Sequence, residues 1–253
     1  MKTLTTDVAV IGAGTAGMSA WRAARAHTPN VLLIERAQYG TTCARVGCMP
    51  SKLLIAAAEA AHTIEHSGVF GVHGGGLRVD GEAVMARVRA ERDRFVGFVV
   101  EAVEGWPVEH RLMGHARFVG PQALQVRTAD GPVQVQAGRV VIATGSRVKG
   151  LPQAGLALDK KLVMSSDEAL TIDHAPKRLA IVGAGAVGCE FADVFNAFGS
   201  EVTLIEALPR ILPLEDADCS AELAKSFKKR GIAVMAAAKL SDVKVGKDSV
   251  SMK

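Results

Sequence analysis

The chain has 253 residues, of which 49% are hydrophobic and 22% are charged, and its formal net charge is +4. This composition is typical of a packed globular protein and excludes a disordered chain or a collagen-like fibre. The 26 glycines, against eight Phe, two Trp and one Tyr, indicate an aliphatic core like that of a parallel α/β sheet. The cations are spread along the chain, so we expect no nucleic-acid partner. No apolar run is long enough to span a membrane, so we expect no membrane association either.

The sequence contains an internal repeat. Residues 8–35 align without a gap with residues 179–206, at an offset of 171 positions. Ten of the 28 aligned positions are identical. Each copy reads as an apolar strand, a glycine turn, an amphipathic helix and a second strand ending in an acid, which is the unit that begins a doubly wound sheet. The shared positions are Gly12, Gly14, Gly17 and Glu35 in the first copy and Gly183, Gly185, Gly188 and Glu206 in the second.

These residue types suit a dinucleotide. The first glycine permits a tight turn, the second lets the backbone approach a pyrophosphate, and the third lets the helix pack on the strand. The N-terminus of the helix favours the phosphate charge, and the acid, 23 positions after the first glycine in both copies, can accept hydrogen bonds from ribose hydroxyls. We therefore predict two Rossmann-like dinucleotide-binding domains of the α/β class.

Two cysteines, Cys43 and Cys48, have four residues between them in the segment GTTCARVGCMPSK, residues 40–52. A metal site would need further ligands that are not evident nearby, so a dithiol is the better interpretation. Five steps of a regular helix rise about 7.5 Å, which exceeds the roughly 7 Å limit between the α-carbons of bridged cysteines. We expect the segment to depart from a regular helix, with Gly47 permitting the departure and Pro50 suiting the first turn of the next helix.

The remaining elements follow from hydrophobic periodicity and turn residues. Helices are predicted over residues 51–64, 81–105 and 216–230, and strands over 124–127, 140–143 and 232–236. Residues 145–155 resemble a crossover between domains, and residues 243–252 a hairpin around Gly246. We place the two domains at residues 1–148 and 149–253.

The chain resembles the pyridine nucleotide-disulfide oxidoreductases that contain flavin, most closely the dihydrolipoamide dehydrogenases of bacteria. The glycine motif at Gly12, the CxxxxC-x-P-S-K stretch, Ala143-Thr144-Gly145 and the second glycine motif at Gly183 occur in family order. The resemblance covers only the first half or so of a typical member. The returning FAD segment and the C-terminal dimerisation domain with its His-Glu base are not found, so we expect a truncated chain or a fragment.

The resemblance implies a site built around FAD in the first domain. Cys48 would face the flavin as the thiolate, and Cys43 would exchange with disulfide substrates. Lys52, beside the flavin, would pair with Glu190 from the second domain. The cofactor-binding residues implied are Gly12, Gly14, Gly17, Glu35, Thr42, Lys52, Ala116, Thr144, Gly145 and Ser146.

The second domain would bind NAD through Gly183, Gly185, Gly188 and Glu206, with Leu240 further along. A carboxylate at Glu206 favours NAD over NADP because it repels a 2′-phosphate. Arg210 is the one residue that argues against this preference, because NADP enzymes place an arginine nearby to accommodate the 2′-phosphate. The implied reaction moves electrons from dihydrolipoamide, free or on a lipoyl domain, through the cysteine pair and FAD to NAD⁺, in a protein that is a homodimer in the family. Alternatives are a relative of mercuric or glutathione reductase, and a non-catalytic nucleotide-binding fragment.

Other features are interpreted as structural. His-Thr-Ile-Glu-His at residues 62–66 matches a zinc-peptidase pattern, but no third ligand is apparent, so we expect no metal. Cys189 and Cys219 have no partner at redox spacing and are interpreted as structural, since a buried cysteine usually acts as a small hydrophobe. No export signal is evident, because Asp7 precedes the apolar stretch 8–20 and Arg22 follows it, so we expect a cytoplasmic protein.

Overall fold

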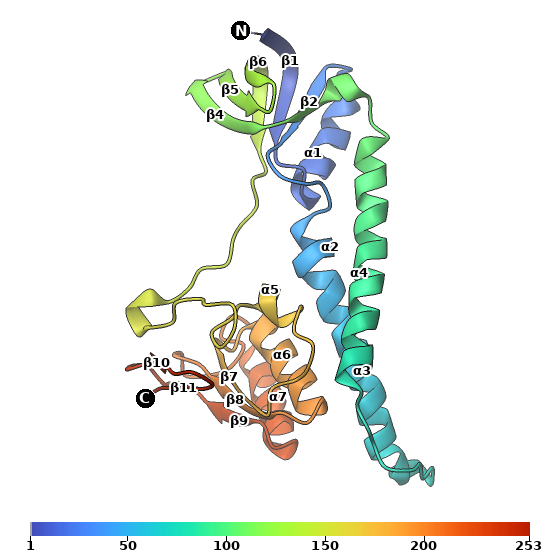
Figure 1. Cartoon of the computed structure of the whole chain (residues 1–253), viewed down its shortest axis with the longest axis vertical. Helices are drawn as coiled ribbons and strands as arrows, with labels where there is room; N and C mark the ends of the chain where they lie inside the picture. Colours follow the sequence, from blue (N-terminus) through green and yellow to red (C-terminus); the bar gives the residue numbers. More distant parts are fainter. Residues whose placement is uncertain (1) are drawn as a thin grey trace. The chain divides into compact units, whose positions relative to one another are not determined.

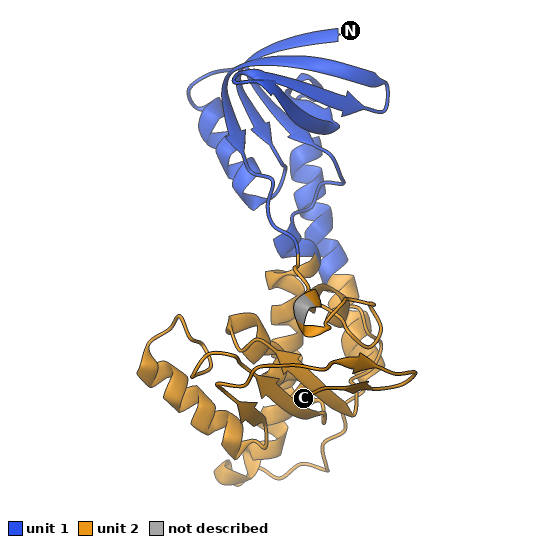
Figure 2. Cartoon of the chain, turned by 90° about the vertical axis from the view of Figure 1, so that its left-hand side faces the viewer, with its two compact units in different colours: residues 1–45, 92–147 blue, residues 46–91, 148–253 orange. Residues whose placement is uncertain are grey.

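The computed structural model describes residues 2–253, and only the backbone of Gln153. The chain forms two compact units, shown in Figure 2. Unit 1 comprises residues 1–45 and 92–147, and unit 2 comprises residues 46–91 and 148–253. Unit 2 therefore contains a segment, residues 46–91, that our predicted division places in the first domain. Which cofactor each unit binds stays a prediction.

Unit 1 is built on a six-stranded mixed sheet with the strand order β3-β2-β1-β6-β5-β4 (Figure 1). Strands β1, β2, β3 and β6 run parallel, and β4, β5 and β6 form antiparallel neighbours. The parallel part is the doubly wound start that the first glycine motif predicts. The strands are β1 (Lys2–Ile11), β2 (Val31–Glu35), β3 (Arg111–Met113), β4 (His115–Gly120), β5 (Ala123–Thr128) and β6 (Gly131–Ile142).

Helix α1 (Thr15–Arg25) connects β1 and β2 and buries Met18 and Trp21. These side chains pack in one cluster with Val10 of β1 and Leu33 of β2. The Trp21 ring stacks on Trp106, with the ring centroids 3.7 Å apart. The apolar face of the first motif is therefore held against its own sheet.

Unit 2 is built on the parallel sheet β7-β8-β9. Strands β7 (Arg178–Val182) and β8 (Glu201–Ile205) flank helix α6 (Ala186–Ala197), and helix α7 (Ala217–Lys229) leads to β9 (Ala233–Met235). The chain continues into the predicted hairpin, formed by β10 (Lys244–Val245) and β11 (Val250–Ser251).

The core of unit 2 joins residues far apart in the sequence. Leu54 and Ala58 of helix α3 (Cys48–His66) share one buried cluster with Ala192, Phe195 and Phe227. This packing places the helix that begins at Cys48 directly against α6. The other helical segments are α2 (Thr42–Val46), α4 (Gly81–Glu104), α5 (Ser166–Ala169) and the short turns η1 (Ser67–Phe70), η2 (Val108–His110) and η3 (Pro152–Ala154).

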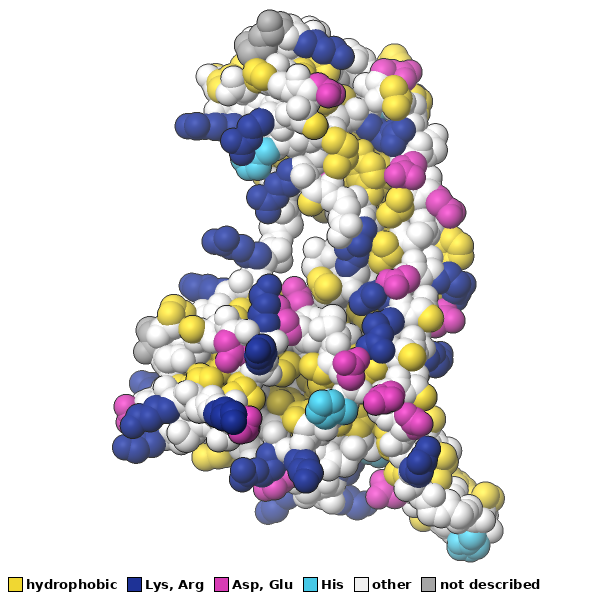
Figure 3. All heavy atoms as spheres, in the orientation of Figure 1, with side chains coloured by type: hydrophobic (Ala, Val, Ile, Leu, Met, Phe, Trp, Pro, Cys, Tyr) yellow, Lys and Arg dark blue, Asp and Glu magenta, His cyan; other side chains and the backbone are white. Residues whose placement is uncertain are grey.

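The sequence-based elements are largely confirmed, with differences in length. Helix α3 is longer than predicted at both ends, and β6 begins nine residues before the predicted strand at residue 140, because β6 pairs with the whole of β1. Strands β3 and β4 were not predicted. Among residues 2–253, no helix has the length and apolar character needed to cross a membrane. On the face drawn in Figure 3, cationic and acidic side chains are interspersed.

We expect Gly17→Ala to destabilise unit 1, because a Cβ there would lie 1.7 Å from the Gly12 carbonyl oxygen. Overpacking of this kind costs about 1–3 kcal/mol. Gly97→Ala in α4 is the matched control, since no atom lies within 4 Å of its Cβ position, and it should stabilise by about 0.5–1 kcal/mol through helix propensity. Urea unfolding measures both changes. Equal effects of the two substitutions would contradict the close approach at Gly17.

Candidate functional site

The two glycine turns have the same geometry. Gly12 and Gly183 have φ angles of +106° and +99°, in the region that favours glycine. A Cβ at Gly188 would lie 2.0 Å from the Gly183 oxygen, and a Cβ at Gly17 would clash with the Gly12 oxygen in the same way, at 1.7 Å. The backbone therefore confirms that the first glycine of each motif forms the tight turn and that the third glycine allows the helix to pack closely against that turn.

The acid at the end of each second strand holds its own glycine turn. Glu35 accepts hydrogen bonds from the backbone N–H of Ala13, at 2.7 Å, and of Ala37, at 2.9 Å. Glu206 accepts them from the N–H groups of Ala184, at 2.8 Å, and Leu208, at 2.9 Å. All these positions correspond at the offset of the repeat, so one interaction is repeated in both units.

Both turns leave room for a phosphate group. No atom lies within 4 Å of a Cβ placed on Gly14 or Gly185, which are the N-cap residues of α1 and α6. Within residues 2–253, no side chain caps either helix through a hydrogen bond, and neither first turn contains an acid. Backbone N–H groups at such helix ends bind anions. The residues therefore fit the pyrophosphate of a dinucleotide.

The cysteine segment is interrupted as predicted. Helix α2 ends at Val46, Gly47 has a non-helical φ of −127° and ψ of −122°, and α3 begins at Cys48. The hydroxyl of Thr41 accepts a hydrogen bond from the Ala44 N–H at 3.0 Å and so begins α2. Cys43 is half-buried and Cys48 is exposed. The Cys48 sulfur is therefore accessible at the start of a long helix.

Lys52 lies one turn beyond Cys48 on α3. Its Nζ lies 2.6 Å from Glu190 Oε1 on α6. The structure thus brings together two residues that are 138 positions apart and that the sequence analysis paired. Both side chains are partly exposed, so the ion pair positions the ammonium group more than it stabilises the fold.

The other predicted cofactor residues lie in different units. In unit 1, Thr42 is the exposed first residue of α2, Ala116 is half-buried in β4, and Thr144, Gly145 and Ser146 are exposed after β6. In unit 2, Leu240 is half-buried beyond β9. Their contacts with a cofactor stay predictions.

Arg210 is engaged by the backbone of its own loop. Its Nη2 donates to the carbonyl oxygens of Pro213, at 3.1 Å, and Glu215, at 2.8 Å. The guanidinium group that could have favoured NADP by binding its 2′-phosphate is thus directed to these carbonyl groups.

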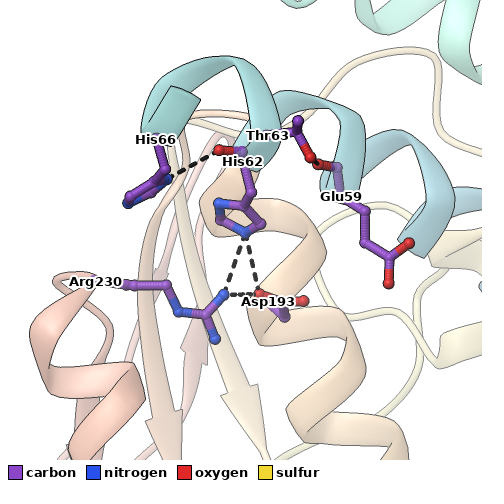
Figure 4. Close-up of polar contacts among 6 residues, drawn as sticks. All are labelled: Glu59, His62, Thr63, His66, Asp193 and Arg230. Atoms are coloured by element: carbon purple, nitrogen blue, oxygen red, sulfur yellow. Dashed lines mark hydrogen bonds and ion pairs between the residues drawn. The ribbon is translucent and has the colours of Figure 1, made fainter. Parts of the chain in front are cut away.

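One polar cluster was not predicted from the sequence. His62 on α3, Asp193 on α6 and Arg230 at the end of α7 meet in unit 2 (Figure 4). His62 Nε2 lies 3.3 Å from Asp193 Oδ1 and 3.2 Å from Arg230 Nη1, and Arg230 also donates to Asp193. No sequence pattern connects these three residues, because each comes from a different helix.

Comparison with known proteins identifies the family. Residues 6–253 match the family described as pyridine nucleotide-disulphide oxidoreductase. The chain belongs to this family. The match includes both glycine turns and the cysteine segment, so the resemblance expected from the motifs is confirmed, as is the fold with its two dinucleotide-binding motifs.

Several relatives resemble the chain over nearly its whole length. It is 35% identical over 246 residues to a dihydrolipoyl dehydrogenase of Bacillus subtilis, covering 92% of this chain and 51% of the relative. It is 34% identical over 252 residues to a leghemoglobin reductase of Vigna unguiculata, covering 97% and 47%. The chain thus spans about half the length of the curated relatives it matches.

Solved structures show the same fold. LpdA from Mycobacterium tuberculosis superposes with a TM-score of 0.83 at 23% identity, covering 100% of this chain and 55% of LpdA. The Cu(II) complex of the HOCl-induced flavoprotein disulfide reductase RclA from Escherichia coli gives 0.79 at 25% identity, covering 98% and 53%. Both comparisons support the fold of the two units.

We expect Cys189 to resist alkylation in the folded protein. It is buried against the Ala184 carbonyl, and burial, together with the charge of Glu206, raises its pKa to about 11. At pH 8 only about 0.1% of such a thiol is thiolate, the reactive form. In the reduced protein, iodoacetamide should modify exposed Cys48 and Cys219 and reach Cys189 only after unfolding. Peptide mapping that finds Cys189 and Cys219 modified at equal rates would contradict this assignment.

Proposed function

We propose that the chain is the FAD- and NAD-binding part of a flavoprotein disulfide reductase of the dihydrolipoyl dehydrogenase type. The observation that carries the proposal is the arrangement on α3: the exposed Cys48 follows a break at Gly47, and the Lys52–Glu190 ion pair lies one turn further along. The identity of about 35% to dihydrolipoyl dehydrogenases supports this choice of substrate. In the complete protein we expect a homodimer that acts on a dithiol, free or attached to a lipoyl domain.

The open turns at Gly14 and Gly185 support the two cofactors of the proposal. The first turn and Glu35 would hold the adenosine diphosphate part of FAD, and the second turn and Glu206 would hold NAD. FAD supplies an acceptor for the electron pair and the means to pass it to NAD⁺ as a hydride. The remaining chemistry falls to the cysteines and to the residues that position them.

Thiol–disulfide exchange links the substrate to the cysteine pair. One thiolate of the substrate attacks the sulfur of Cys43 in the Cys43–Cys48 disulfide, and Cys48 leaves as a thiolate. The second substrate thiolate then displaces Cys43 from the mixed disulfide, so the substrate leaves oxidised and the cysteine pair holds two electrons. Two protons are released in the exchange. The exposed position of Cys48 leaves its side chain open to this exchange.

The preference for NAD over NADP is part of the same proposal. Glu206 is almost fully buried, and its carboxylate already accepts two backbone N–H groups. It would accept a ribose hydroxyl and repel a 2′-phosphate. Arg210 is tied to the carbonyl groups of residues 213 and 215, which leaves it poorly placed to bind a phosphate instead.

The electron capacity of the FAD-loaded chain tests the proposal. We expect anaerobic titration with dithionite to require about two electron pairs per FAD, one for the flavin and one for the cysteine disulfide. Cys43→Ser and Cys48→Ser should each reduce this to about one pair. Cys219→Ser, at an exposed cysteine on α7, is the matched control and should keep two.

Two results would contradict the proposal. One is an unmutated protein that takes up a single electron pair per FAD. The other is non-reducing peptide mapping of the air-oxidised protein that finds Cys43 and Cys48 as separate thiols.

A further inference from the structure

The last turns of α3 carry three side chains with metal-ligand atoms. One such atom from each of His62, Glu65 and His66 lies within 4.8 Å of the others. Their spacing in the helix, i, i+3 and i+4, brings the side chains together on the surface. Glu65, the acid within the His-Thr-Ile-Glu-His pattern, thus lies close enough to both histidines to offer a third ligand atom, which the sequence alone did not show.

We propose that His62, Glu65 and His66 bind a divalent first-row transition cation, with Asp193 as the acceptor that orients His62. This site lies outside the dithiol and cofactor machinery described above. Cys48 and His66 begin and end the same helix, 18 residue steps apart, which corresponds to about 27 Å.

The first support is that each imidazole has one nitrogen already directed to an oxygen acceptor. His66 Nδ1 lies 2.9 Å from the carbonyl oxygen of His62. A carbonyl can only accept, so Nδ1 carries the proton and Nε2 keeps its lone pair for a metal. Histidines that bind metals characteristically donate their other N–H to a carbonyl or carboxylate in this way.

His62 has the same arrangement with a carboxylate. Its Nε2 lies 3.3 Å from Asp193 Oδ1 and 3.2 Å from the donor Arg230 Nη1, so it can face either group according to its tautomer, and in Figure 4 the second ring nitrogen lies on the side of the ring toward His66. A metal at Nδ1 selects the tautomer that donates from Nε2 to Asp193. Arg230 donates to Asp193 as well and keeps this carboxylate in place.

The donor set indicates which cations fit. Two neutral imidazoles and one carboxylate suit Zn²⁺, Cu²⁺ or Ni²⁺, whereas Mg²⁺ and Ca²⁺ prefer oxygen ligands. Bonds of about 2.0–2.2 Å place two ligand atoms of one metal at most about 4.4 Å apart. Glu65 is exposed and can rotate to meet this limit while His66 keeps its hydrogen bond to the His62 carbonyl, and water can complete the coordination.

Calorimetric titration with Zn²⁺ tests the site. The protein is first alkylated with iodoacetamide, so that thiolates do not compete for the metal. We expect one equivalent to bind, and binding should raise Tm because the metal stabilises only the folded state. His66→Ala should weaken binding at least 10-fold and abolish the rise in Tm. His73→Ala, at an exposed histidine outside the cluster, is the matched control and should change neither.

Three further variants test the individual roles. Glu65→Gln should weaken Zn²⁺ binding. Glu59→Gln, at an exposed glutamate that precedes Glu65 on α3, is the matched control and should not. Asp193→Asn should weaken binding about 10–100-fold, as expected for an orienting acceptor. Because this change also breaks the Arg230 pair, Tm without metal is recorded as its control for folding.

Failure of this inference is separable from failure of the proposed function, since the assay uses neither FAD nor active cysteines. The inference is overturned if the alkylated protein binds no Zn²⁺, or if His66→Ala binds as tightly as the unmutated protein. Equal losses in His66→Ala and His73→Ala would equally overturn it. The spectrum of bound Co²⁺ should show nitrogen and oxygen ligation without a thiolate charge-transfer band.

Discussion

The hydrogen bonds from each glycine turn to the acid after the second strand are the interaction on which both units depend. Gly12 and Gly183 have positive φ angles, and the N–H of the residue after each donates a hydrogen bond to Glu35 or Glu206. One carboxylate therefore connects the end of β2 or β8 to the turn that begins α1 or α6. In the proposed function, the open face of the turn would receive a phosphate and the acid would lie beside the ribose.

This shared interaction explains why the repeat was readable from the sequence. Its residues are close in the chain, and each has a local physical requirement: positive φ at the first glycine, close approach at the third, and an acceptor at the end of the strand. The break at Gly47 was predictable for the same reason, since helix geometry alone limits a cysteine pair with this spacing.

What could not be predicted depends on contacts between distant elements. Nothing in residues 46–91 shows that they join the second unit, because that follows from Leu54 and Ala58 packing beside α6. The Asp193–Arg230 pair beside His62 has no sequence pattern either. The Lys52–Glu190 contact was anticipated through the family resemblance, and neither residue taken alone points to it.

Helix α3 connects the chemical features of unit 2. It begins at the exposed Cys48, carries Lys52 in its second turn, and ends with the proposed metal ligands. Its packing on α6 places both Glu190 and Asp193 beside it, one for each half of the helix. The N-terminus of helix α6 thus follows the second glycine turn, and side chains on the same helix contact Lys52 and His62 of α3.

The central claim is that each acid serves a different cofactor, and binding measurements on Glu35→Gln and Glu206→Gln test it most directly. A lost charged hydrogen bond is worth about 1.5–3 kcal/mol, or about 10-fold or more in Kd. The account predicts that Glu35→Gln weakens FAD binding alone, and that Glu206→Gln weakens NADH binding alone and narrows the discrimination against NADPH. Exchanged effects of the two variants, or tighter binding of NADPH than NADH by the unmutated protein, would contradict it.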